Sequence, residues 1–176
     1  MKIDYSAASA FALERHGEQD HGCLKIGDHL ADVAENVRKH YDPHINICDP
    51  EEVIAAAWLH DCVEDTGTSP EDIHRRFGSN VGTLVDLLTD KEGKNRLERH
   101  LRTYHMIRRH PDAILIKLCD RRHNQARSIE HGERWAIMYH REYLYFKFAL
   151  YNTGQFMALW SELDNQYKKL EDLTTW

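Results

Sequence analysis

Apolar residues along this chain recur at helical spacing, with no sustained alternation of apolar and polar positions. Leu30, Val33, Ala34 and Val37 show the pattern most clearly, since they follow the i, i+3, i+4, i+7 spacing of one helix face. The same spacing, with caps and Gly or Pro breaks, predicts helices over residues 5–18, 29–41, 51–66, 69–77, 81–90, 95–109, 113–129, 141–151 and 156–173.

The apolar run over residues 113–119 by itself also fits a buried strand. Because no second strand-like run exists to pair with it, we interpret it as a buried helix. We therefore expect an all-α fold, a single helical bundle of about eight or nine helices. Its length of 176 residues fits one domain, over residues 1–176.

Composition narrows the function classes. A net charge of −6 argues against a general nucleic-acid-binding surface. The four cysteines form no CxxC pair, which favours a reducing, cytoplasmic setting. No apolar run is long enough to cross a membrane and no signal-peptide pattern is found, so no membrane partner is expected. Most of the 13 histidines, His100 among them, are expected at the surface.

Four ionisable side chains crowd the end of the helix predicted over residues 51–66: His60, Asp61, Glu64 and Asp65. Three neighbouring carboxylates repel one another unless a cation neutralises them. Imidazole and carboxylate together suit a divalent transition metal, and the remaining carboxylates suit a base that activates water. The alternative is a solvated helix end with a capping network.

Three further residues join this set. Asp120 follows a nearly all-apolar segment, where a buried carboxylate needs an arginine or a metal as its partner. Asn124 lies four residues later on the same helix face. His29 stands at the start of a predicted helix, for which Asp28 is the expected cap.

The order His29, His60-Asp61, Asp120 resembles the HD-domain superfamily of metal-dependent phosphohydrolases. The blocks LHDCVEDTGTSPEDI, IKLCDRRHN and HLADVAENV, together with the pair Glu142-Tyr143, are most similar to the RelA/SpoT-type small alarmone hydrolases, the metazoan SpoT homologues. The resemblance covers residues 5–150.

This resemblance implies a role for each matching position. His29, His60, Asp61 and Asp120 would bind one divalent ion, Mn²⁺ in that family, with Zn²⁺, Co²⁺, Fe²⁺ or Ni²⁺ as alternatives. Glu64 and Asp65 would position and deprotonate the attacking water, and a small nucleotide would be the partner. The remaining candidates are substrate contacts: Asn124 and Tyr143 from the resemblance, and Lys25 and Arg121 as possible phosphate contacts.

The implied reaction is removal of the 3′ pyrophosphate from (p)ppGpp. Two alternatives stay open. The first keeps the metal site but acts on dNTPs, nucleoside monophosphates or NADPH, because the segment before His29 offers only Lys25 where the family is basic. The second is a non-catalytic nucleotide-binding module. The sequence also leaves a homo-oligomer open.

Overall fold

Helices make up almost all of the structure, which is a computed structural model and describes residues 4–22 and 24–174. The two strands of the described part, β1 (Asp20–His21) and β2 (Leu24–Lys25), are two residues long and pair antiparallel. The all-α prediction is confirmed. The helices are α1 (Tyr5–His16), α2 (Ile26–His40), α3 (Pro50–Leu59), α4 (Cys62–Asp65), α5 (Pro70–Leu88), α6 (Arg96–Ile107), α7 (Pro111–His131), α8 (Glu133–Leu150) and α9 (Met157–Thr174).

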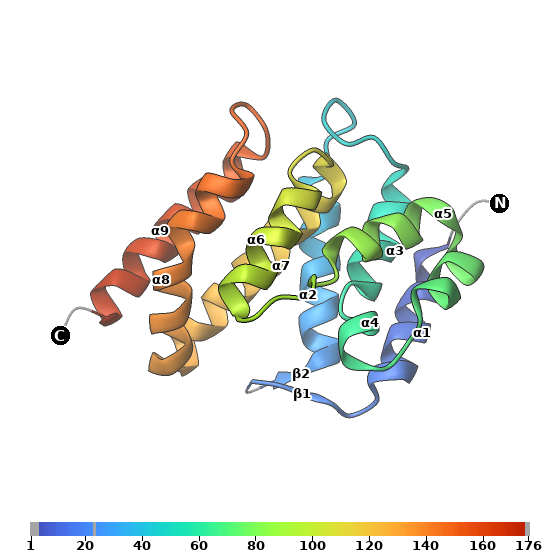
Figure 1. Cartoon of the computed structure of the whole chain (residues 1–176), viewed down its shortest axis with the longest axis horizontal. Helices are drawn as coiled ribbons and strands as arrows, with labels where there is room; N and C mark the ends of the chain where they lie inside the picture. Colours follow the sequence, from blue (N-terminus) through green and yellow to red (C-terminus); the bar gives the residue numbers. More distant parts are fainter. Residues whose placement is uncertain (1–3, 23, 175–176) are drawn as a thin grey trace.

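Helices α2 and α7 cross the middle of the molecule and pack against each other (Figure 1). Helices α1, α3 and α5 lie on the α2 side, and α8 and α9 lie on the α7 side. The β1–β2 hairpin covers the end of α2 from which that helix starts. Segments distant in sequence therefore meet along α2 and α7.

Helix α5 is kinked where the sequence predicts a break. Gly78 has φ 84° and ψ 172°, a backbone conformation open to glycine and strained for other residues. The helical segments on its two sides bury Ile73, Phe77, Val81 and Val85. The predicted interruption at residues 78–80 is thus confirmed as a kink, with little chain between the two halves.

The start of α2 differs from the prediction. Asp28 is not the cap, because the helix begins at Ile26 and Asp28 lies in its first turn. Pairing of Asp20 with Lys25 in the hairpin carries the chain directly into the helix. Ile26 is fully buried there, and this apolar contact extends the helix by one turn before the predicted cap.

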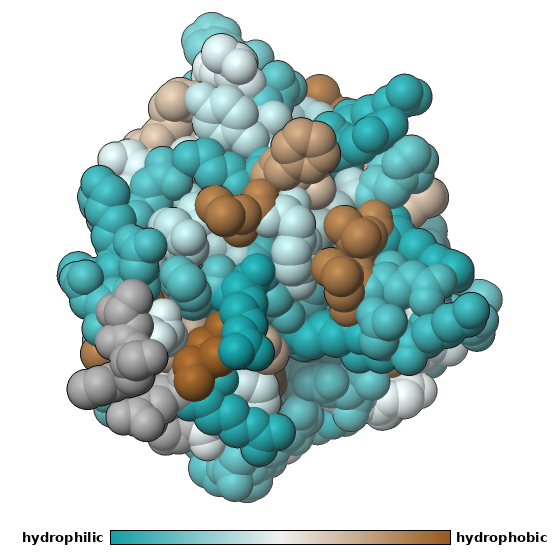
Figure 2. All heavy atoms as spheres, turned by 60° about the vertical axis from the view of Figure 1, so that its left-hand side comes forward, coloured by the Kyte–Doolittle hydropathy of each residue, from teal (hydrophilic) through white to brown (hydrophobic). Residues whose placement is uncertain are grey.

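The surface is mostly hydrophilic on the face that carries α6, α8 and α9, with separate apolar patches (Figure 2). Exposed apolar residues on these helices include Leu97 and Leu101 of α6 and Leu144 and Phe148 of α8. No helix in the described ranges is both long and apolar enough to cross a membrane.

Candidate metal centre and nucleotide cleft

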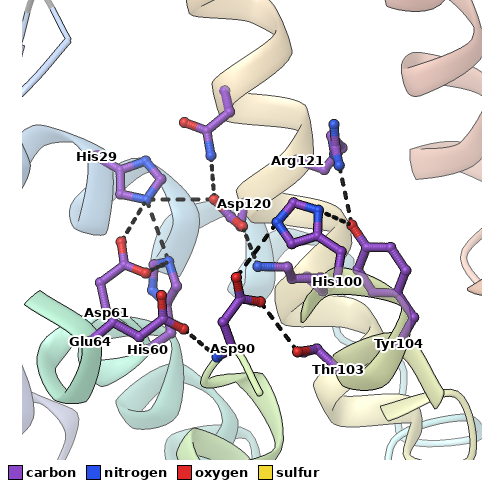
Figure 3. Close-up of polar contacts among 12 residues, drawn as sticks. His29, His60, Asp61, Glu64, Asp90, His100, Thr103, Tyr104, Asp120 and Arg121 are labelled. Atoms are coloured by element: carbon purple, nitrogen blue, oxygen red, sulfur yellow. Dashed lines mark hydrogen bonds and ion pairs between the residues drawn. The ribbon is translucent and has the colours of Figure 1, made fainter. Parts of the chain in front are cut away.

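The pair His60-Asp61 lies in a turn, where we had predicted one continuous helix. Helix α3 ends at Leu59 and the one-turn helix α4 starts at Cys62. In an unbroken helix, consecutive side chains point about 100° apart around the axis. The turn instead lets both side chains face the same space, in which His29 and Asp120 also lie (Figure 3).

The four predicted metal ligands meet at this turn. His29 Nε2 lies 3.4 Å from His60 Nε2, 3.5 Å from Asp61 Oδ2 and 3.7 Å from Asp120 Oδ1. His60 Nε2 lies 3.2 Å from Asp61 Oδ1. His29 comes from α2 and Asp120 from α7, so the two central helices each supply one of the four.

This donor set fits a divalent ion. Ligand atoms bonded at about 2.1 Å to one ion lie roughly 3–3.5 Å apart, and one ligand atom each of His29, His60 and Asp120 lies within 4.8 Å of the other two. Asp61 adjoins this trio, with a different oxygen toward each histidine. His60 Nδ1–H donates to the Ala57 carbonyl oxygen at 2.8 Å, which leaves the Nε2 lone pair directed into the cluster. Two imidazole nitrogens that face each other beside two carboxylates are the arrangement a cation stabilises.

The electrostatics point the same way. Burial opposes ionisation of Asp120, yet the nearby Lys117 holds the pKa of this carboxyl well below its usual range. Burial also lowers the pKa of His29, which favours the neutral imidazole that binds metals. Lys117 Nζ lies 3.0 Å from Asp120 Oδ2.

A second layer of side chains holds these groups in place. Asn124 Nδ2 donates to Asp120 Oδ1 at 2.5 Å, and His21 Nε2 lies 3.0 Å from Asn124 Oδ1. His21 also stacks on His29, with ring centroids 4.2 Å apart. His123 meets His29 edge-on and shares a 2.8 Å hydrogen bond with Asp32. The hairpin and α7 thus both orient the ligands.

Glu64 and Asp65 project from α4 into a cavity of about 210 Å³ beside the cluster. Glu64 keeps access to solvent in this cavity, and the Asp90 backbone N–H donates to its Oε1 at 2.5 Å. The surrounding protein nevertheless raises the pKa of Glu64 by removing solvent from the carboxylate. Asp65 accepts a hydrogen bond from Gln19 at 2.9 Å.

The cavity beside the cluster continues into a larger one of about 430 Å³. His21, Asn124 and Tyr139 line both, so the two form one bipartite cleft. Three basic groups also line the smaller part: Arg96, Lys117 and Arg121. Polar and aromatic groups complete the larger part, among them Arg127, Ser128, His131 and Trp135.

The four predicted substrate contacts lie in different places. Asn124 lines both parts of the cleft, and Arg121 lines the smaller part. Lys25 lies on β2, where it pairs with Asp20 at 2.8 Å. Tyr143 is buried between α8 and α9, and its hydroxyl donates to Asp164 at 2.6 Å. Tyr139, one helical turn earlier, lines the cleft instead.

His100 is 6% exposed, so the expectation that it lies at the surface is wrong. It lines the smaller part of the cleft, with Nε2 3.6 Å from Asp90 Oδ2 and Nδ1 3.3 Å from the Tyr104 hydroxyl. Burial, with the nearby Arg96, lowers the pKa of His100 to about 4, so the ring is neutral at pH 7. The polar composition of α6 gives no sign that His100 is buried, because the ring faces the interior only once the helix packs in the fold.

Arg121 is held by a buried ion pair. Its Nη2 donates to Glu142 Oε2 at 3.2 Å and to the Tyr104 hydroxyl at 3.3 Å. Arg96 donates to the other Glu142 oxygen at 2.6 Å. Burial opposes the charge of Glu142, but its arginine partners hold its pKa below the ordinary 4.5. One carboxylate thus fixes two cleft arginines.

Glu142→Gln is expected to lower the free energy of unfolding by about 3 kcal/mol at pH 7, since it leaves a buried guanidinium without its counter-charge. The stabilisation by Glu142 is full above its unfolded pKa and is lost as the pH falls through the lowered folded pKa. The mutational difference should therefore shrink below about pH 4. Urea unfolding at several pH values measures it.

The control is Glu98→Gln, which alters an exposed pair with Arg102 on α6. It should change the free energy of unfolding by less than about 1 kcal/mol. Equal losses in the free energy of unfolding for Glu142→Gln and Glu98→Gln would contradict a stabilising role for the buried pair.

Comparison with known proteins agrees with this geometry. The family model described as HD domain matches residues 7–150. A solved structure titled as a metazoan ortholog of SpoT that hydrolyzes ppGpp aligns with a TM-score of 0.76 at 26% identity and covers 96% of both chains.

Two curated relatives carry the name guanosine-3′,5′-bis(diphosphate) 3′-pyrophosphohydrolase. The Aquifex aeolicus protein is 36% identical over 126 residues, which span 66% of this chain and 16% of that protein. Human MESH1 is 40% identical over 73 residues, which span 41% of each chain. The matched parts are thus less than two thirds of these relatives. Because the family match spans more than half of the chain, the chain belongs to the HD-domain family.

Proposed function

We propose that this protein is a metal-dependent hydrolase that removes the 3′ pyrophosphate from (p)ppGpp and yields GDP or GTP. The observation that carries the proposal is the cluster of His29, His60, Asp61 and Asp120 beside the Glu64 carboxylate, in a cleft that basic groups also line. The names of the relatives support the same substrate.

His29, His60, Asp61 and Asp120 would hold one divalent ion, for which we propose Mn²⁺. Such an ion lowers the pKa of a coordinated water and offsets negative charge on phosphoryl oxygens. The chain supplies the rest. Two neutral imidazoles and two carboxylates leave the site with little net charge once a divalent cation is bound, which suits an anionic substrate.

Glu64 is the group best placed to take a proton from the attacking water. Its carboxylate lies in the same cavity as the cluster, and its raised pKa brings its basicity closer to neutral pH. Asp65 is the proposed partner that positions the water. Gln19 orients Asp65 from the loop before β1, so the hairpin region also aligns this carboxylate.

The substrate would extend along both parts of the cleft. Lys117, Arg96 and Arg121 line the smaller part with the carboxylates, and they would stabilise a leaving pyrophosphate there. The larger part, with Trp135 and Tyr139, has the size and aromatic surface for a nucleoside. Asn124 stands between the two and would contact the ribose or its 3′ phosphate.

One observation favours a second substrate class. Lys25 is committed to Asp20 and to the Glu18 carbonyl oxygen, so its charge is neutralised within the hairpin. In this arrangement neither Lys25, the possible phosphate contact, nor the buried Tyr143, the contact that the resemblance implies, lines the cleft. A dNTP, a nucleoside monophosphate or NADPH is therefore the alternative substrate of the same site.

From its cysteines we also propose a cytoplasmic location.

A hydrolysis panel tests the proposal. The Mn²⁺-loaded protein is incubated with ppGpp, dNTPs, nucleoside monophosphates and NADPH, and the products are separated by chromatography. GDP plus pyrophosphate from ppGpp, at a kcat/KM at least about tenfold above the other substrates, is the expected result. Faster hydrolysis of a dNTP or monophosphate would reject ppGpp and keep the metal site. No turnover of any nucleotide would reject the enzyme.

A further inference from the structure

A second cluster of metal-ligating side chains lies away from the cleft. Cys48, His110 and Asp112 each offer a ligand atom, and these atoms all lie within 4.8 Å of one another. Cys48 comes from the loop before α3, and the other two flank Pro111 at the start of α7. Asp112 precedes Asp120 by eight residues on α7, about 12 Å along the helix axis.

Asp112 is a fully buried carboxylate with neutral donors around it. Asn46 Nδ2 donates to its Oδ1 at 2.7 Å, and the backbone N–H groups of Ile47 and Cys48 donate at 3.2 Å and 3.0 Å. Among the described residues no lysine or arginine pairs with it, and the one ionisable nitrogen nearby is His110 Nδ1 at 3.8 Å. A buried anion without a cationic partner is costly, and a metal ion would compensate it.

His110 offers an uncommitted ligand atom beside Asp112, and the Cys48 thiol hydrogen-bonds to the same carboxylate. His110 Nδ1 is buried and, within the part of the chain that the structure describes, accepts or donates no hydrogen bond. The ring is otherwise 22% exposed, which leaves a path for a metal ion and a water molecule. Burial, together with the hydrogen bond to Asp112, raises the pKa of the Cys48 thiol to about 12.

We propose that Cys48, His110 and Asp112 form a second metal site that binds Zn²⁺, with water as the fourth ligand. Thiolate, imidazole and carboxylate together select zinc over the harder Mg²⁺, Ca²⁺ and Mn²⁺. Ligand atoms around tetrahedral zinc lie roughly 3.3–3.8 Å apart, and the distance from His110 Nδ1 to Asp112 Oδ2 is 3.8 Å. The hydrogen bonds that Asp112 accepts orient its carboxylate, as is common for ligating carboxylates.

Binding exchanges the Cys48 thiol proton for the metal and releases that proton to solvent. The ion then joins the loop over residues 42–49 to the first turn of α7, the helix that also carries Asp120 and Asn124. The site is structural, and it rests on none of the groups assigned to hydrolysis.

Metal content and cobalt spectroscopy test the site on the full-length protein. The wild type is expected to bind two equivalents of added divalent metal per chain. Each of the variants Cys48→Ser and His60→Ala is expected to bind one equivalent. With Co²⁺, a thiolate-to-cobalt charge-transfer band is expected in the wild type and in His60→Ala, because the four residues of the cleft centre include no cysteine. Cys48→Ser should lose the band.

His110→Ala provides a second variant should Cys48→Ser not fold. Its matched control is His44→Ala, which removes an exposed histidine from the loop that carries Cys48. His110→Ala should lower zinc affinity at least about tenfold, and His44→Ala should not change it. One metal equivalent and no thiolate-to-cobalt band in the wild type would overturn the second site, and this result leaves the nucleotide panel unaffected.

Discussion

Asp61→Asn is expected to lose the bound divalent ion and to lower kcat/KM by more than about a hundredfold. One carboxylate oxygen of Asp61 lies 3.2 Å from His60 Nε2, and the other lies 3.5 Å from His29 Nε2. Loss of a group that only supports a ligand costs about 10–100-fold in metal affinity or activity, so loss of a ligand should cost more. Asp120→Asn should behave in the same way.

Metal content and steady-state hydrolysis, measured on the same preparations, check this result. The matched control is Asp28→Asn, which alters an exposed carboxylate one residue before His29 and should retain both properties. An Asp61→Asn protein that turns over substrate normally without bound metal would overturn the proposed mechanism.

Glu64→Gln is expected to keep the metal and to lower kcat by about 10²–10⁴, the usual contribution of a positioned general base. The amide preserves the shape of the side chain and the acceptor for the Asp90 N–H. In the wild type, kcat should fall as acid protonates Glu64, because the base acts only when ionised. Since burial raises the pKa of Glu64, this loss should begin at a higher pH than for an ordinary glutamate.

The pH profile separates a base from a merely structural carboxylate. Glu64→Gln should lose the acid limb of the kcat profile, and Glu71→Gln, on the exposed first turn of α5, should keep it. A Glu64→Gln protein with an unchanged profile would assign the proton transfer to Asp65.

Local patterns predicted most helices because each has a distinct apolar face and a recognisable start. Asp49 caps α3, where its side chain accepts from the Glu51 backbone N–H and Glu52 completes a capping box. The extra turn of α2 was missed because Ile26 is helical only through burial against the rest of the fold. Helix propensity along a short segment does not account for contacts with distant parts of the chain.

The candidate ligands were found because ionisable residues stood out inside apolar segments. The residues that orient them were missed for the opposite reason. His21, Lys117 and His123 have no distinctive local pattern, and their roles arise only when the hairpin and α2 pack on α7. Tyr139 was missed because the helix predicted over residues 141–151 begins too late; α8 spans Glu133–Leu150 and carries Tyr139 one turn before Tyr143.

The turn between α3 and α4 ties metal affinity to packing in the hydrophobic core. Ala55, Ala56 and Ala57 stand just before it and are fully buried, so α3 has no free space in which to rotate or slide. A larger side chain at any of them would displace the helix and, with it, His60 and Asp61. Overpacking of about 1–3 kcal/mol can leave the chain folded while the ligands move apart. We therefore expect metal affinity to fall in an overpacked variant that is still folded.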